Sequence, residues 1–179
     1  LGEDAFQYTK EQKQEAQIRY LIQQAKIRNS ELKTTSIQDF IRTLKDIKAD
    51  GKSLELSNIE VSAYASPDGG MKLNTDLAKN RESSSSNYVK QELKRLKMAG
   101  NVEAKYTAED WEGFQQLVSQ SNIQDKDIIL RVLSLYPDPE ERERQIRNLS
   151  AGFRELADEI LPELRRARLT INYLLIGRS

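Results

Sequence analysis

The 179-residue sequence contains no histidine and no cysteine. Their absence excludes Ser-His-Asp and Cys-His catalysis, thiolate metal sites and disulfide bonds. Only an oxygen-ligand metal site would remain, and the chain has no spaced Asp/Asn loop of the calcium type. No pair of carboxylates stands in a sequence context that predicts a catalytic pocket. We therefore expect a non-enzymatic protein without catalytic residues, metal or cofactor.

The chain also lacks an excess of either charge and any long apolar run. Its 28 Lys and Arg residues balance 28 Asp and Glu residues, so there is no overall field to hold nucleic acid. No apolar segment approaches the ~20 residues of a membrane-spanning helix. Charged residues make up 31% and hydrophobic residues 37% of the chain, which indicates a globular protein with a highly charged surface.

Apolar periodicity predicts five secondary-structure elements between residues 18 and 106. They are a strand at 18–23, a helix from Thr35 or Ser36 to Asp50-Gly51, a strand at 54–65 with a break near Ser57-Asn58, a helix at about 73–97, and a strand at 102–106. This alternation favours a sheet with helices packed on it. Residues 1–16 are mostly Gln, Glu and Lys and predict a loosely held N-terminal arm.

Residues 107–164 are predicted to be helical, after which the chain returns to the sheet. The clearest helix start is Asp138-Pro139-Glu140-Glu141, which has a cap residue, a proline and a glutamate in the order of a capping box. Alternating apolar residues predict a final strand at 168–176. The sequence thus predicts a single α+β domain over 1–179, with a βαβαβ core closed by a C-terminal strand, a mixed sheet covered by helices, and a helical insert at 107–164.

A turn-rich segment, Ser66-Pro67-Asp68-Gly69-Gly70, joins the second predicted strand to the next helix. Glycine allows backbone geometry closed to other residues, and a helix N-terminus carries free N–H donors. Asn74 and Arg81 follow seven residues apart, so they share one helix face, and a guanidinium fits a carboxylate. These groups could hold a small carboxylate ligand. In the other interpretation, Arg81 pairs with Asp76 or Glu82, and Asn74 only caps the helix.

This segment resembles the peptidoglycan-binding motif of the OmpA-like domain family. The family pattern is a strand, then Thr-Asp, two variable residues, Gly, four variable residues, Asn, two variable residues, Leu-Ser, two variable residues and Arg-Ala. Gly69, Asn74, Leu77 and Arg81 stand at the family's Gly, Asn, Leu and Arg with this spacing. The family also has an Arg-Arg pair before its last strand, where this chain has Arg165-Arg166. The resemblance covers about residues 17–106 and 163–176.

The resemblance implies a peptidoglycan-binding module in the periplasm of a Gram-negative cell envelope, associated with the outer membrane. In the family, the Asp accepts the amine of the stem-peptide diaminopimelate, and the Arg takes its carboxylate. Here Ser66 stands at the Asp position and supplies no charge. Asp68 compensates if the loop folds back; in the simpler interpretation it makes an Asx-type turn with Gly69 and Gly70. The residues expected at the ligand are Ser66, Asp68, Gly69, Asn74, Arg81, Arg165 and Arg166.

The alternative is an envelope scaffolding domain that has lost the ligand and binds an envelope protein through its helical insert. Ser66 motivates this hypothesis, together with Trp111, Phe114 and Tyr136, which form either a partner surface or part of the insert's core. In both hypotheses the chain itself carries no membrane span, and a membrane anchor or barrel can be attached to it in the full protein.

Overall fold

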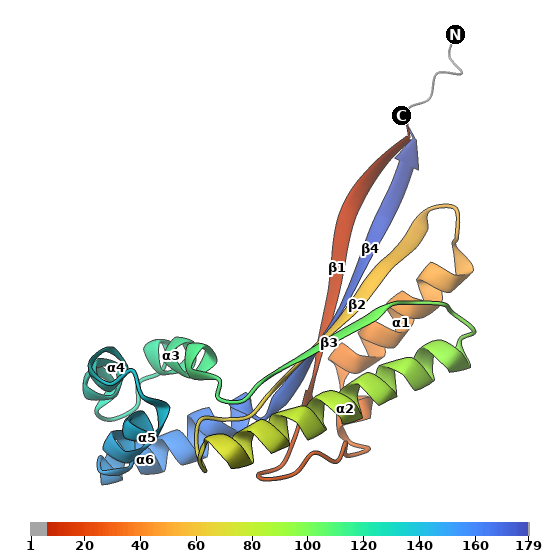
Figure 1. Cartoon of the computed structure of the whole chain (residues 1–179). Helices are drawn as coiled ribbons and strands as arrows, with labels where there is room; N and C mark the ends of the chain where they lie inside the picture. Colours follow the sequence, from red (N-terminus) through yellow and green to blue (C-terminus); the bar gives the residue numbers. More distant parts are fainter. Residues whose placement is uncertain (1–6, 179) are drawn as a thin grey trace.

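The protein is built on a four-stranded mixed sheet with the strand order β1-β4-β2-β3. The computed structural model describes residues 7–178 (Figure 1). The strands are β1 (Gln7–Arg19), β2 (Leu54–Tyr64), β3 (Val102–Thr107) and β4 (Arg166–Arg178). Strand β4 lies between β1 and β2 and is antiparallel to both, whereas β2 and β3 are parallel. The α+β core closed by a C-terminal strand is therefore confirmed.

Helices α1 (Thr35–Ala49) and α2 (Met71–Arg95) pack on the sheet (Figure 1). Alternate strand residues such as Val61 and Leu169 point toward the helices, and Phe40, Leu44 and Val89 on the helices complete one buried core. These are the residues whose spacing, two on strands and three or four on helices, predicted the elements. The core fixes the position of α2 and hence of the loop that precedes it.

Helix α2 and strand β2 each have one local feature that bears on the packing of the sheet. Helix α2 runs without interruption through Ser83 to Ser86, and Ser85 and Ser86 are buried, because small side chains let the helix lie close to the sheet. Strand β2 changes its register against β4 between Leu56 and Asn58, where the sequence predicted a break.

The N-terminal strand differs from the expectation. Residues 7–16, expected as part of a loosely held arm, belong to β1, which pairs with β4 along its whole length from Gln7 to Arg19. The predicted strand at 18–23 ends instead at Arg19, and a turn follows. Most side chains of β1 before Ala16 are exposed, so this part of the strand depends on main-chain hydrogen bonds and has no apolar period. Residues 1–6 of the expected arm lie outside the described residues.

A helical insert connects β3 to β4 and has its own core. Its elements are α3 (Trp111–Gln120), α4 (Lys126–Leu135), α5 (Pro139–Arg147), α6 (Ser150–Glu155), the π-helical turn η2 (Leu156–Ile160) and the 3-10 turn η3 (Leu161–Leu164). The Asp138 side chain accepts a hydrogen bond from the N–H of Glu141, so the predicted helix cap is present. The insert gathers beside the start of α2 (Figure 1).

The insert's aromatic side chains pack on its core. Phe114 is buried, and the ring of Trp111 meets it edge-on with 5.3 Å between the ring centroids. Trp111 and Tyr136 are half-buried against the same cluster. This packing favours the core interpretation of these aromatics over a partner surface. Among the helices of residues 7–178, none combines the length and apolar character needed to cross a membrane.

Candidate functional site

A cavity of about 30 Å³ lies where the loops after β1 and β2 meet α2 and the start of β4. Six of the seven residues predicted at a ligand line it, namely Ser66, Asp68, Gly69, Asn74, Arg81 and Arg165. The other lining residues are Ile22, Gln23, Leu73 and Leu77. Because a single water needs roughly 10–15 Å³ of such space, the cavity admits a group about as large as a carboxylate.

Arg81 forms the floor of the site and is completely buried. Its Nε donates to the carbonyl of Gln24 at 2.9 Å, its Nη1 to that of Tyr64 at 3.0 Å, and its Nη2 to that of Leu21 at 3.2 Å. A guanidinium has five N–H donors. These three bonds therefore leave one N–H on each terminal nitrogen for another acceptor.

The charge of Arg81 is retained inside the protein. Burial lowers its pKa to about 10, so the side chain stays protonated at neutral pH. The ring of Tyr20 lies 5.3 Å from the guanidinium carbon, and the Tyr20 hydroxyl shares a 2.6 Å hydrogen bond with Ser85. The alternative pairing with Asp76 or Glu82 is not what the structure has, because the partners of Arg81 are main-chain carbonyls.

The loop after β2 folds back on itself beside this arginine. The hydroxyl of Ser66 donates a hydrogen bond to Oδ1 of Asp68, and the Asp68 N–H donates to the Ser66 carbonyl at 2.8 Å. Gly69 and Gly70 have φ values of 95° and 89°, which glycine adopts without strain. The negative charge of Asp68 favours the protonated form of Arg81. The hydrogen bond from Ser66 thus holds the carboxylate of Asp68 at the cavity, and this carboxylate supplies the negative charge that a serine lacks.

The side chains of Arg165 and Arg166, at the start of β4, lie in different surroundings. Arg165 lines the cavity, and its buried Nε has no hydrogen-bond partner among the described residues. Arg166 points elsewhere: its Nη2 lies 3.4 Å from Oδ2 of Asp110, and its Nη1 donates to the carbonyl of Glu163. Neighbouring residues of an extended chain point to opposite sides, so only one of the pair reaches the cavity. Arg166 does not line the cavity, and its part at a ligand stays a prediction.

Asn74 connects the site to two carboxyl groups that the sequence analysis missed. Its Nδ2 donates to Oε2 of Glu109 at 2.8 Å, so the amide ties α2 to the segment before α3 instead of capping its own helix. The N–H of Gly70 donates to Oε1 of Glu143 in α5 at 3.4 Å. Burial, followed by a hydrogen bond with the carboxyl of Glu109 and that group's charge, raises the pKa of Glu143 to about 8.

No spacing rule could find this carboxyl pair, because Glu109 and Glu143 lie on different elements of the insert.

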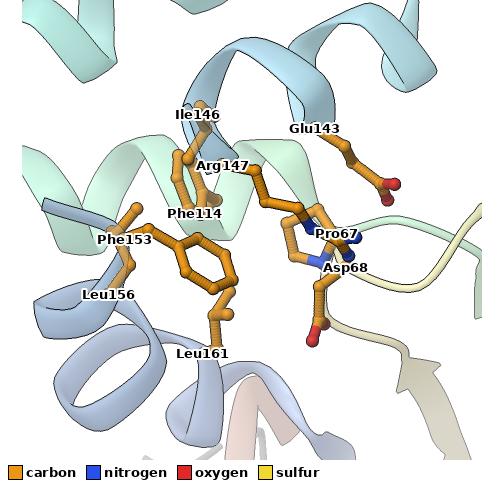
Figure 2. A pocket seen from close by; sticks show the side chains of 9 residues that line it. All are labelled: Pro67, Asp68, Phe114, Glu143, Ile146, Arg147, Phe153, Leu156 and Leu161. Atoms are coloured by element: carbon orange, nitrogen blue, oxygen red, sulfur yellow. The ribbon is translucent and has the colours of Figure 1, made fainter. Parts of the chain in front are cut away.

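The insert also supports the loop by apolar contact. A void of about 10 Å³ is lined by Pro67 and Asp68 of the loop and by Phe114, Phe153 and Leu161 of the insert. Figure 2 shows these side chains close to one another. The β2–α2 loop is therefore held from α5 and from the insert's core as well as from the sheet.

Comparison with known proteins gives a likeness among solved structures. No family model matches the chain, and no curated protein matches it. Among solved structures, it is similar to the OmpA-like domain of FopA1 from Francisella tularensis subsp. tularensis SCHU S4. The two share 13% sequence identity over 99% of this chain and 85% of that one, with a TM-score of 0.42.

Proposed function

We propose that this chain is a non-catalytic peptidoglycan-binding module of the Gram-negative cell envelope, located in the periplasm. It holds the diaminopimelate of a stem peptide at the cavity beside α2. The observation that carries the proposal is the hydrogen bond from Ser66 to Asp68. It supports a carboxylate beside Arg81, and the resembling family has an acid at the position of Ser66. The motif spacing of Gly69, Asn74 and Arg81 supports the same ligand.

The charges at the cavity complement the end group of diaminopimelate. A ligand carboxylate accepts from the two remaining N–H groups of Arg81 and from Arg165, whose Nε is buried without a partner in the described residues. The ligand ammonium donates to the carboxylate of Asp68. In this function no covalent bond is broken or formed, and the residues at the cavity only bind and orient the ligand. A weak single contact is sufficient, because a polymer of repeating stem peptides raises retention by avidity.

Asp68→Asn is expected to weaken binding of meso-diaminopimelate at least tenfold. The asparagine oxygen still accepts from Ser66, so the loop keeps its shape while the charge that faces the ammonium is lost. A charge-assisted hydrogen bond contributes about 1.5–3 kcal/mol, which corresponds to roughly 10- to 100-fold in affinity. Isothermal titration calorimetry with meso-diaminopimelate measures the effect, and cosedimentation with purified peptidoglycan reports it on the polymer.

Asp76→Asn is the matched control, because Asp76 is exposed on α2 and does not line the cavity. It should bind as the wild-type protein does. Equal affinity of Asp68→Asn and the wild type would remove Asp68 from the site.

The scaffolding alternative is favoured by one observation, the engagement of Arg81 with three carbonyls, which gives this residue a structural role without any ligand. The two functions differ in the behaviour of the unmodified protein. Wild-type protein that neither cosediments with peptidoglycan nor binds meso-diaminopimelate would favour scaffolding, whereas binding that depends on Asp68 would support the module proposed above.

A further inference from the structure

The mouth of the cavity carries exposed apolar side chains. Ile22 and Leu73 line the cavity and are 56% and 46% exposed. Their neighbours Leu21 and Met71 are 43% and 37% exposed. These are four of the nine large hydrophobic side chains that are exposed in the described part of the chain, the others being Tyr8, Tyr106, Ile128, Leu135 and Leu175. Single exposed apolar residues need no explanation, but four on the two segments beside one cavity do.

Both segments are held in place by the site itself. The turn from Leu21 to Gln24 is closed by its own hydrogen bond of 3.0 Å and places Gln23 at a φ of 57°. Arg81 donates to the carbonyls at both ends of this turn, so the buried cation fixes the position of Ile22. Leu73 stands in the first turn of α2, where a methyl group added to Gly69 would lie 3.3 Å from its Cδ2. Ile22 and Leu73, which form the apolar rim of the cavity, are therefore held in position before any ligand binds.

The size of the cavity leaves most of a ligand outside it. About 30 Å³ accommodates the charged end of a ligand and no more. Whatever is attached to that end must leave the cavity past its exposed lining residues, which include Ile22 and Leu73. Apolar atoms placed there leave water, whereas a polar chain would lose hydration without gaining a partner.

We propose that Ile22 and Leu73 form an apolar subsite for the aliphatic residue next to the anchored diamino acid. This inference rests on the proposed function and makes it more specific: the preferred ligand is a stem peptide in which an alanine adjoins diaminopimelate. The charged cavity selects the end group, and the rim selects the methyl-bearing neighbour. Covering about 50 Å² of apolar surface corresponds to a gain of roughly tenfold in affinity.

Calorimetry with two probes tests the subsite. The probes are meso-diaminopimelate alone and the tetrapeptide in which L-alanyl-γ-D-glutamyl-diaminopimelate ends in D-alanine. Wild-type protein is expected to bind the tetrapeptide about tenfold more tightly than the free amino acid. The double variant Ile22→Ser/Leu73→Ser is expected to lose this advantage, so that it binds the two probes with affinities that agree within about twofold. Both side chains are exposed, so the fold should persist in the variant.

Leu135→Ser is the matched control, because Leu135 is 64% exposed and lies on α4, outside the lining of the cavity. It should behave as wild type toward both probes. If the double variant keeps the full tetrapeptide affinity, the subsite is wrong while the proposed function stands. If the wild type binds neither probe, the proposed function fails and the subsite fails with it.

Discussion

Arg81→Ala is expected to destabilise the folded protein by about 3–5 kcal/mol, with no ligand present. The substitution removes a donor from the carbonyls of Leu21, Gln24 and Tyr64, of which that of Leu21 keeps the N–H of Gln24, and it opens a cavity where the guanidinium was. Each unsatisfied buried acceptor costs about 1–3 kcal/mol, and partial entry of water reduces the total. Urea denaturation followed by circular dichroism measures the loss as a lower midpoint.

Two variants separate the parts played by charge and geometry. Arg81→Lys keeps the charge but lacks the planar fork, so it cannot serve three carbonyls in different directions and should recover less than half of the loss. Arg95→Ala is the matched control: Arg95 is exposed on the same helix and, among the residues that the structure describes, pairs with Glu92 alone, so its loss should cost less than about 0.5 kcal/mol. A cost below about 1 kcal/mol for Arg81→Ala would show that these carbonyl contacts do not stabilise the fold.

The structural contacts of Arg81 change how binding experiments with its variants are interpreted. A variant of Arg81 that fails to retain peptidoglycan does not separate a lost ligand contact from a displaced loop, because the same side chain holds the turn that carries Ile22. Variants of Asp68, Ile22 and Leu73 avoid the problem. Within residues 7–178, the Asp68 side chain has Ser66 as its hydrogen-bond partner, and the two apolar residues are exposed.

The sequence predicted the location of the cavity but not the partners of its central residue. The spacing of Gly69, Asn74 and Arg81 follows from one turn and one helix face, so it could be read along the chain. The acceptors of Arg81 are main-chain carbonyls, which every residue carries, and they leave no signature in the choice of side chains at Leu21 or Gln24. A buried arginine of this kind therefore looks, in the sequence, like a surface arginine on a helix.

The N-terminal strand escaped prediction for a related physical reason. Apolar alternation marks a strand only where one face is buried, and Gln7 to Glu15 are exposed or half-exposed throughout. Their order comes from the ladder with β4, between Gln7↔Arg178 and Arg19↔Arg166, and any non-proline residue can contribute to a ladder. The hydrophobic pattern located α1, β2 and α2 because their side chains meet in one core.

The conformation of the loop that carries Ser66 and Asp68 is only partly explained by the local sequence. The sequence left two roles for Asp68, an Asx-type turn with Gly69 and Gly70 or a replacement for the family's acid in a loop that folds back. In the structure Ser66 donates to Asp68, and the ligand role of Asp68 stays a proposal. What the sequence could not supply is the reason the loop keeps this shape. Pro67 lies beside apolar residues of the insert (Figure 2), and the N–H of Gly70 donates to the carboxyl of Glu143. Both are contacts between segments that are distant in the sequence.

The stability of the insert–loop contact should fall as the pH rises from about 5 to 8. Glu143 has a pKa of about 8 in the folded protein, against 4.5 as its ordinary value, because burial and the carboxyl of Glu109 disfavour its ionised form. A raised carboxyl pKa means that the folded state binds the proton more tightly than the unfolded chain. Its stabilising contribution is therefore complete below about pH 4.5, declines above it and is lost once the pH passes 8.

Glu143→Gln should remove this dependence, because a glutamine mimics the protonated carboxyl at every pH. Its oxygen accepts from the N–H of Gly70, and its amide donates to Glu109. The free energy of unfolding of the variant should exceed that of the wild type by an amount that grows between pH 5 and 8 and then levels off. Since Glu143 is only partly shielded from water, we expect about 1–2 kcal/mol, well under the unscreened value for such a shift.

Glu140→Gln, at an exposed position of the same helix, is the control, and its free energy of unfolding should change with pH in parallel with that of the wild type. Parallel curves for Glu143→Gln and the wild type would instead mean that the Glu109–Glu143 pair does not hold a proton and that the loop is fixed by Pro67 and the apolar contacts alone.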